Sequence, residues 1–275
     1  RDSMKKKLSL LVGLIFVLSS CHKEDAQNKI RIVASPTPHA ELLESLQEEA
    51  KDLGIKLKIL PVDDYRIPNR LLLDKQVDAN YFQHQAFLDD ECERYDCKGE
   101  LVVIAKVHLE PQAIYSKKHS SLERLKSQKK LTIAIPVDRT NAQRALHLLE
   151  ECGLIVCKGP ANLNMTAKDV CGKENRSINI LEVSAPLLVG SLPDVDAAVI
   201  PGNFAIAANL SPKKDSLCLE DLSVSKYTNL VVIRSEDVGS PKMIKLQKLF
   251  QSPSVQHFFD TKYHGNILTM TQDNG

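Results

Sequence analysis

Residues 131–153, LTIAIPVDRTNAQRALHLLEECG, combine a short apolar run with an amphipathic segment. The run LTIAIP is rich in β-branched residues, which is typical of a buried strand. Thr140 and Gln143 match the S/T-x-x-E/Q capping box, so a helix is predicted to begin at Thr140 and to end at Gly153. Its apolar residues recur on one face at helical spacing: Ala142, Ala145, Leu146 and Leu149. A strand that leads directly into such a helix is the repeating unit of an α/β fold.

Arg144 lies off this apolar face, in the first turn of the predicted helix. The positive end of the helix dipole disfavours a cation there, by roughly 0.3–1 kcal/mol. No carboxylate stands three or four residues away to compensate the charge. Arg144 therefore requires an anion from elsewhere, which is either another segment of the chain or a ligand.

The same alternation of strands and helices continues on both sides of this stretch. Strands are predicted at 30–34, 55–62, 77–81, 101–108, 113–116, 178–183, 195–201 and 229–234. Helices are predicted at 38–53, 68–75, 83–95, 185–192 and 203–210, and two more within 241–263. This order predicts mostly parallel sheets covered on both faces, and the length allows two α/β lobes. Ligands of such folds bind at the carboxyl ends of strands, commonly between the lobes.

The N-terminal segment has the pattern of an export signal. Met4 is followed by three lysines and by the apolar run LSLLVGLIFVLSS, which ends at Cys21. The run is shorter than the ~20 residues that a membrane-spanning helix needs. Leu18 to Cys21 resembles a bacterial lipobox, so residues 1–20 are interpreted as a signal peptide, Cys21 as the lipidated residue and 21–29 as a tether. An ordinary signal or an uncleaved anchor is the alternative. The expected location is a membrane lipid anchor that faces the periplasm or the cell exterior.

Composition narrows the function classes. The net charge of +1 gives no reason to expect a nucleic-acid partner. Export permits disulfides, and six cysteines follow Cys21: Cys92, Cys97, Cys152, Cys157, Cys171 and Cys218. Their two C-x4-C pairs lack a histidine or second pair at zinc-finger spacing, which favours buried thiols or one or two disulfides over a metal site. Their connectivity stays open. No phosphate-binding, hydrolase or dinucleotide motif is present, which favours a binding protein without cofactor over an enzyme.

Polar and aromatic side chains gather at the predicted strand ends. They are Asn80, Tyr81, Phe82, Gln83 and His84 in DANYFQHQAFL, His108, Glu110 and Tyr115 in VHLEPQAIYSKK, then Asn141, Arg144, Asn203 and Asn229. Each alone has an ordinary reading as a cap, a core aromatic or an ion-pair member. Together they suit one kind of ligand. Arginine donates to a carboxylate, asparagine carbonyls accept from an ammonium group, and aromatic rings contact an apolar or thioether side chain. The site is therefore predicted to bind an amino acid.

Several motifs in order resemble the NlpA-type family of methionine-binding lipoproteins. The matching runs are SPTPHAELL (35–43), VDANYFQHQAFL (77–88), VHLEPQAIYSKK (107–118), IPVDRTNAQRALHLL (135–149), DVDAAVIPGNFAIAANL (194–210) and YTNLVVIR (227–234). The resemblance covers about residues 30–270. It implies a type II periplasmic-binding-protein fold whose lobes close on methionine. It also implies a monomer that docks on the permease and ATPase of an ABC importer.

The resemblance also assigns roles to residues. Arg144 would hold the ligand carboxylate with Asn141 beside it, and Asn203 and Asn229 would contact the amino and carboxylate groups. The side-chain pocket would be lined by Tyr81, Phe82, His84 and Tyr115. Lobe 1 would comprise 30–114 and 229–270, and lobe 2 would comprise 115–228. The chain departs from the usual family pattern at four positions: Gln85, Gln112, Val137 and Arg139.

Three other functions remain open at this point. A metal-uptake protein could use His84, His108, Glu110 and another acid, although the histidines form no paired metal motif. An enzyme on the same fold could bind a substrate carboxylate through Arg144. A surface adhesin could retain a vestigial pocket.

Overall fold

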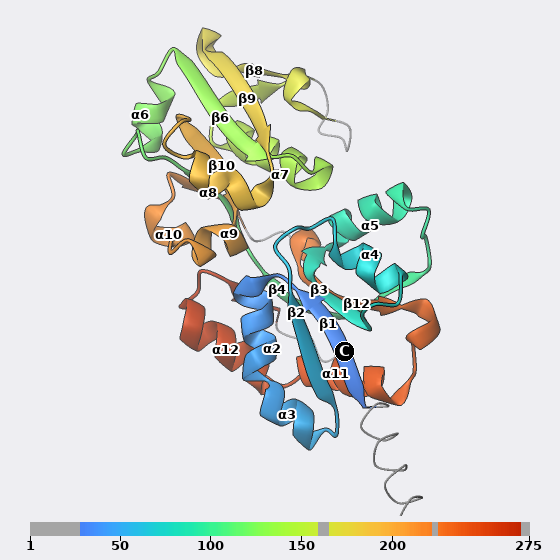
Figure 1. Cartoon of the computed structure of the whole chain (residues 1–275). Helices are drawn as coiled ribbons and strands as arrows, with labels where there is room; N and C mark the ends of the chain where they lie inside the picture. Colours follow the sequence, from blue (N-terminus) through green and yellow to red (C-terminus); the bar gives the residue numbers. More distant parts are fainter. Residues whose placement is uncertain (1–27, 159–164, 222–224, 271–275) are drawn as a thin grey trace, which may run out of the picture.

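The chain folds into two α/β lobes (Figure 1), in a computed structural model that describes residues 28–158, 165–221 and 225–270. The signal-like segment, Cys21 and most of the tether lie outside the described residues. Within the described ranges, no helix is long and apolar enough to cross a membrane.

Lobe 1 is built on a six-stranded sheet in the order β13-β4-β12-β3-β1-β2. Its strands are β1 (Lys29–Ala34), β2 (Lys56–Pro61), β3 (Ala79–His84), β4 (Leu101–Leu109), β12 (Asn229–Arg234) and β13 (Leu268–Thr269). Strand β1 pairs in parallel with β2 and β3, whereas β12 runs antiparallel between β3 and β4. Burial on both faces explains why the last three residues of β1, Ile32–Ala34, are all apolar.

Helices cover both faces of this sheet, and each face has its own apolar core. One core joins the sheet to α2 (Glu41–Ser45), α3 (Gln47–Asp52), α11 (Pro241–Phe250) and α12 (Pro253–Tyr263). The single-turn element η1 (Pro36–Ala40) directly precedes α2. The other core joins it to α4 (Pro68–Leu73) and α5 (Gln85–Arg94). Alternate residues of β1 serve the two cores, with Ile32 on one face and Val33 on the other.

Lobe 2 is built on a five-stranded sheet in the order β11-β5-β10-β6-β9. Its strands are β5 (Gln112–Tyr115), β6 (Lys130–Pro136), β9 (Ser177–Val183), β10 (Ala197–Pro201) and β11 (Cys218–Leu219), beside a separate pair of β7 (Ile155–Cys157) and β8 (Val170–Gly172). Its helices are α6 (Leu122–Lys126), α7 (Arg139–Glu151), α8 (Leu188–Ser191), α9 (Gly202–Ala207) and α10 (Pro212–Asp215). The first two pack on one face, and α8 and α9 pack on the other.

The chain crosses between the lobes in two places. The first crossing is at Glu110 and Pro111, between β4 and β5, and the second lies between β11 and β12. The first crossing comes a few residues before the predicted boundary at 114/115, because Gln112–Tyr115 already pairs antiparallel with β10 of lobe 2. The strands adjoining the crossings are antiparallel, so both sheets are mixed rather than mostly parallel.

The strand–helix unit at 131–153 forms as predicted, but its helix begins earlier. The side chain of Asp138 accepts the backbone N–H of Asn141 at 3.0 Å, so Asp138 is the N-cap and α7 starts at Arg139. Thr140, the predicted cap, instead donates its hydroxyl to the same Asp138 carboxylate. Arg144 therefore lies in the second turn, farther from the helix end than predicted. Gly153 stops the helix as expected, with a φ of 73°.

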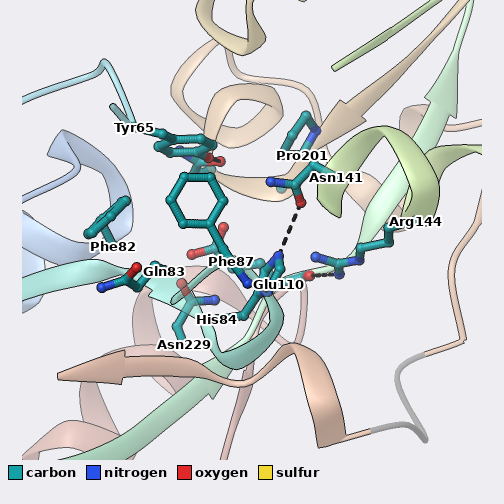
Figure 2. Close-up of a pocket in the computed structure, with 12 residues that line it drawn as sticks. Tyr65, Phe82, Gln83, His84, Phe87, Glu110, Asn141, Arg144, Pro201 and Asn229 are labelled. Atoms are coloured by element: carbon teal, nitrogen blue, oxygen red, sulfur yellow. Dashed lines mark hydrogen bonds between the residues drawn. The ribbon is translucent and has the colours of Figure 1, made fainter. Parts of the chain in front are cut away.

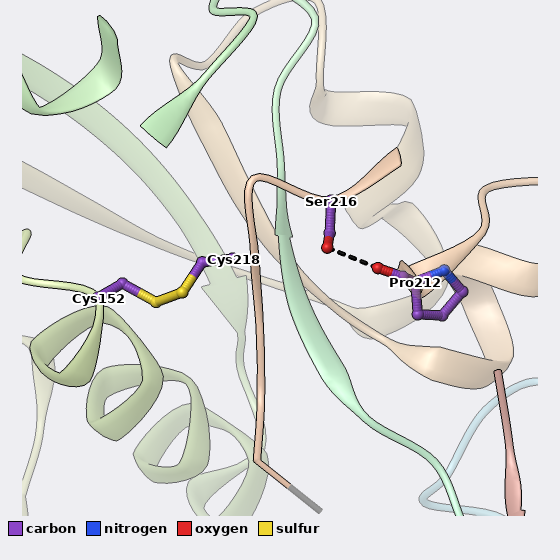
Figure 3. The surroundings of a disulfide bond; sticks show 4 residues. All are labelled: Cys152, Pro212, Ser216 and Cys218. Atoms are coloured by element: carbon purple, nitrogen blue, oxygen red, sulfur yellow. Dashed lines mark hydrogen bonds between the residues drawn. A yellow bond between two sulfur atoms is a disulfide. The ribbon is translucent and has the colours of Figure 1, made fainter. Parts of the chain in front are cut away.

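A disulfide closes the other end of α7. Cys152, directly after the helix, is bonded to Cys218 on β11 (Figure 3). The turn before β11 is closed by the Ser216 hydroxyl, which donates to the Pro212 carbonyl at 2.6 Å. The pair lies 66 residues apart in sequence and ties the helix to an edge strand of lobe 2.

Candidate ligand-binding site

A pocket lies between the lobes, at the carboxyl ends of β3 and β10 and at both crossings (Figure 2). Its free space, including the part open to solvent, is about 380 Å³. Lobe 1 and the crossings supply Tyr65, Phe82, Gln83, His84, Phe87, Glu110 and Asn229, and lobe 2 supplies Asn141, Arg144, Pro201, Gly202 and Asn203. Six of the eight predicted ligand-contact residues are thus brought together.

The strand–helix junction of lobe 1 places the aromatic wall. His84 ends β3 and caps α5, because its Nδ1 accepts the backbone N–H of Phe87 at 3.3 Å. An accepting Nδ1 leaves the proton on Nε2. The ring of Phe87 then lies against Phe82 and Tyr65, with centroid distances of 5.7 and 5.9 Å. Three rings therefore line one side of the pocket.

The junctions of lobe 2 place the polar wall. Asn141 and Arg144 project from α7, and Asn203 comes from the start of α9, directly after β10. Gly202 precedes Asn203 where the backbone passes close to the first crossing. A Cβ at Gly202 would approach the Pro111 carbonyl oxygen to 2.9 Å, so a larger residue would push α9 away from the crossing.

Hydrogen bonds across the pocket hold the lobes in contact. Nε2 of His84 lies 3.2 Å from Oδ1 of Asn141, and the Tyr65 hydroxyl donates to Oδ1 of Asn203 at 2.8 Å. Asn141 is further oriented by Gln112, whose Nε2 donates to the same Oδ1 at 3.1 Å. Gln112, one of the departures from the family pattern, thus acts on the site through Asn141.

The anion beside Arg144 comes from another segment, as one of the two sequence hypotheses allowed. Nε and Nη2 of Arg144 donate to the two carboxylate oxygens of Glu220 at 2.7 and 2.5 Å, and Nη2 also donates to the Glu110 carbonyl at 2.6 Å. Glu220 lies 76 residues farther along the chain. The Tyr227 ring packs on the guanidinium, 4.2 Å from Cζ. These hydrogen bonds use Nε and Nη2 of Arg144, and none of the three uses Nη1.

A buried hydrogen-bonded chain supports the pocket floor. Glu110 Oε1 lies 2.6 Å from Nε2 of His108 and 3.5 Å from Nε2 of His39, and the latter lies 2.9 Å from Oδ1 of Asn229. Burial raises the pKa of Glu110 and lowers the pKa of His39 to about 4 and that of His108 to about 3. The imidazoles are therefore neutral at pH 7, and the chain fixes Asn229 from behind.

Tyr81 and Tyr115, two of the predicted pocket residues, lie elsewhere. Side chains alternate along a strand, so Tyr81 points away from Phe82 and packs in the core of lobe 1. Its hydroxyl lies 2.6 Å from Nδ1 of His108, which makes it part of the buried chain instead. Tyr115 packs in the core beneath α8 in lobe 2. The departure at Gln85 is also remote, because its exposed side chain donates to Asp89.

Sequence reasoning missed Tyr65 and Phe87 as pocket residues, and it named Gln83 at the strand end without giving it a ligand contact. Tyr65 follows β2 in the VDDYR segment, so its place after a strand was the available signal. Phe87 lies one helical turn beyond His84. Gln83 is held by Asn69, whose Oδ1 accepts from Nε2 of Gln83 at 2.8 Å. That contact joins α4 to β3 and has no local signature in the sequence.

Arg139, another departure from the family pattern, forms an ion pair across the mouth of the cleft. Its Nη2 contacts Asp90 Oδ1 and lies 3.3 Å from Glu93 Oε2, and both acids are on α5 of lobe 1. The guanidinium side chain is 46% exposed, so salt screens this contact. The ion pair links the helix that carries Arg144 to the helix that carries Phe87.

Replacing Arg139 with alanine should weaken ligand binding only slightly and in a salt-dependent way. Exposed ion pairs contribute about 0.2–1 kcal/mol, so the expected loss of affinity is roughly 1.5- to 5-fold at low salt and smaller at high salt. Titration calorimetry at two salt concentrations measures this. Arg31→Ala is the matched control, since Arg31 is similarly exposed and pairs with Asp78 inside lobe 1. An equal loss of ligand affinity in both variants would show that the contact between the lobes does not depend on Arg139.

Two lobes joined by two crossings, with a polar and aromatic pocket between them, define the type II periplasmic-binding-protein fold. The sequence profile of NlpA lipoproteins matches residues 30–271. The methionine-binding lipoprotein MetQ of Bacillus subtilis is 33% identical over 98% of this chain and 100% of its own. The chain belongs to the NlpA lipoprotein family.

Solved structures agree with this assignment. A nutrient-binding protein from Burkholderia cenocepacia bound to methionine has a TM-score of 0.81 and 35% identity, over 88% of this chain and 100% of that one. A periplasmic substrate-binding protein of an ABC transporter from Coxiella burnetii has a TM-score of 0.80 and 33% identity, over the same shares.

Proposed function

We propose that this lipoprotein captures free methionine between its lobes and delivers it to an ABC permease and its ATPase. The observation that carries the proposal is the polarity of the pocket. Arg144 lines one side, carbonyl and carboxylate acceptors lie beside it, and three aromatic rings line the other side.

The residues present fit each part of methionine. Nη1 of Arg144 would donate to the carboxylate, with Asn141 beside it. Glu110, Asn203 and Asn229 offer oxygens to the ammonium group. The thioether would lie among Tyr65, Phe82 and Phe87, where sulfur–aromatic contacts contribute about 0.3–1.5 kcal/mol. His84 would close the pocket through its bond to Asn141. Binding to both walls stabilises the closed arrangement over an open one.

The proposed function also includes a lipid anchor and two protein partners. Cys21 would carry the lipid and hold the domain at a membrane surface outside the cytoplasm. A permease and its ATPase would accept the ligand from the closed protein. The names of the relatives support a lipoprotein that binds methionine for a transporter. In this proposal the protein acts as a monomer and uses no cofactor.

A ligand series tests the proposal directly. Protein comprising residues 22–275 is unfolded, stripped of ligand, refolded and titrated by calorimetry with L-methionine, D-methionine, norleucine and methioninol. L-Methionine should bind one to one. Norleucine, which replaces sulfur with a methylene, should bind roughly 2- to 12-fold more weakly through loss of the sulfur–aromatic contacts. Methioninol, which has no carboxylate, should bind far more weakly than norleucine does. A folded protein that binds none of these would overturn the proposal.

A divalent metal is the second candidate ligand, because His39, His108 and Glu110 bring three potential ligand atoms within 4.8 Å of one another. His84, which the sequence hypothesis included, instead contacts Asn141. Two imidazoles and a carboxylate could hold zinc. Metal analysis of purified protein separates the candidates. Stoichiometric zinc or manganese that resists mild chelation would favour the metal, and metal-free protein that binds methionine would favour the amino acid.

A further inference from the structure

The six cysteines of the described chain lie as three neighbouring pairs. Cys152 and Cys218 form the disulfide of lobe 2. Cys157 and Cys171 lie on the paired strands β7 and β8, one register position apart. The remaining two are Cys92 and Cys97 in lobe 1, whose sulfur atoms are 3.0 Å apart. Residues one register position apart point to opposite faces of a ladder, so Cys157 and Cys171 are not aligned for a bond, whereas the sulfurs of Cys92 and Cys97 are close together.

The local backbone holds Cys92 and Cys97 together. Cys92 is in the last turn of α5, and Cys97 lies in the turn that leads to β4. The N–H of Cys97 donates to the carbonyl of Cys92 at 2.9 Å, which closes the turn. The two sulfurs are about 1 Å farther apart than a disulfide bond of ~2.0 Å. A small side-chain rotation is therefore sufficient to join them.

We propose that Cys92 and Cys97 form a second disulfide, in lobe 1, in the exported protein. In this exchange one cysteine thiolate attacks a sulfur of a donor protein disulfide and releases one donor thiolate. The other cysteine thiolate then attacks the mixed disulfide and releases the second donor thiolate. The two cysteines lose two electrons and two protons, and the donor disulfide is reduced to a dithiol. The inference rests on the export included in the proposed function and is independent of the ligand.

Burial determines when the bond forms and how long it lasts. Cys92 is 8% exposed and Cys97 is 2% exposed, among apolar residues of the core between α4, α5 and the sheet. Burial raises the pKa of Cys92 to about 12, so little thiolate exists once this core has closed. The exchange therefore occurs during folding. Afterwards the same burial excludes thiol reductants, which makes the bond structural rather than a switch.

The bond would fix a helix that serves the pocket. It ties the end of α5 to the turn before β4. The first turn of α5 carries Phe87 in the pocket wall, and its outer face carries the two acids that pair with Arg139. A covalent link at the far end keeps this helix seated on the sheet when lobe 2 contacts it.

Peptide mapping of the exported protein tests the assignment. The full chain is exported from its host, denatured without reductant, treated with N-ethylmaleimide and digested with trypsin. Cleavage after Arg94 separates the cysteines, so a disulfide appears as peptide 76–94 linked to peptide 95–98. The linked peptides containing Cys152 and Cys218 provide the positive control in the same digest. Maleimide on both Cys92 and Cys97, with that control pair linked, would overturn the proposal.

Two further samples show whether the bond joins these two cysteines and depends on export. In exported Cys97→Ala protein, Cys92 should become labelled, whereas an unlabelled Cys92 would mean that it pairs with a different cysteine. Protein folded in a reducing cytoplasm should label at both positions. Methionine titration of the mapped sample is separate. Labelled cysteines in a protein that binds methionine would refute only this disulfide, and a linked pair in a protein that binds no amino acid would refute only the ligand.

Discussion

Replacing Arg144 with alanine should weaken methionine binding by roughly 30- to 3,000-fold, which corresponds to about 2–5 kcal/mol for truncating one partner of a desolvated charge pair. The variant removes the only guanidinium that lines the described pocket. It also leaves Glu220 unpaired, and the side chain of Glu220 is 10% exposed. We therefore expect a lower free energy of unfolding as well, because an uncompensated buried charge is costly.

A double variant separates the two effects. Arg144→Ala with Glu220→Ala removes both charges, so its free energy of unfolding should lie closer to that of the parent than the single variant does. Its affinity for methionine should remain as low as that of the single variant. Titration calorimetry on protein shown to be folded by circular dichroism gives both quantities. Affinity within threefold of the parent in the double variant would mean that Arg144 does not hold the ligand carboxylate.

Lowering the pH from 7 to 5 should destabilise the protein strongly. Burial lowers the native-state pKa of His39 to about 4 and those of His84 and His108 to about 3, whereas imidazoles in the unfolded chain titrate near 6.5. The unfolded state then binds more protons, so stability is complete above pH 6.5 and is lost as the pH falls toward the native values. At pH 5 the loss is up to about 2 kcal/mol for each histidine. The raised pKa values of Glu110 and Asp138 act in the opposite direction and offset part of it.

Urea unfolding at the two pH values, at constant ionic strength, measures this dependence. His84→Asn is the informative variant, because asparagine can still cap α5 but does not titrate. Its stability should fall by about one third less than that of the parent between pH 7 and 5. Unfolding free energies that are equal at both pH values would show that these imidazoles are not held neutral.

Local patterns in the sequence were enough to predict the strand–helix junctions, and junctions are where this fold gathers its pocket. That is why Asn141, Arg144, Asn203 and Phe82 could be proposed as pocket residues from their positions alone. Tyr81 was predicted to line the pocket but points into the core of lobe 1. Side chains alternate along a strand, and the sequence alone did not reveal which face of β3 meets the pocket. Helix α7 begins earlier than predicted because Asp138 and Thr140 are both good caps, and the carboxylate of Asp138 accepts from the helix N–H groups.

Pairings between distant segments could not be predicted in this way. Glu220 follows a two-residue strand and carries no motif, yet it is the partner that Arg144 required. His39 comes from η1, which follows β1, and reaches Asn229, which is 190 residues away. Such contacts depend on how the sheets bring segments together, so only the need for a partner was visible in the sequence.

The attachment of α7 to lobe 2 has a consequence for ligand choice. The helix is bound to one edge segment twice, by the disulfide at Cys152 and by the ion pair at Arg144. These two links restrict how far the guanidinium of Arg144 can move to follow a ligand of a different length. An amino acid with a longer side chain would therefore keep lobe 2 rotated away from lobe 1, so that the lobes close incompletely. In the proposed function, selectivity for side-chain length would then depend on the angle between the lobes. A permease that recognises the closed form would not accept a ligand that holds the lobes apart.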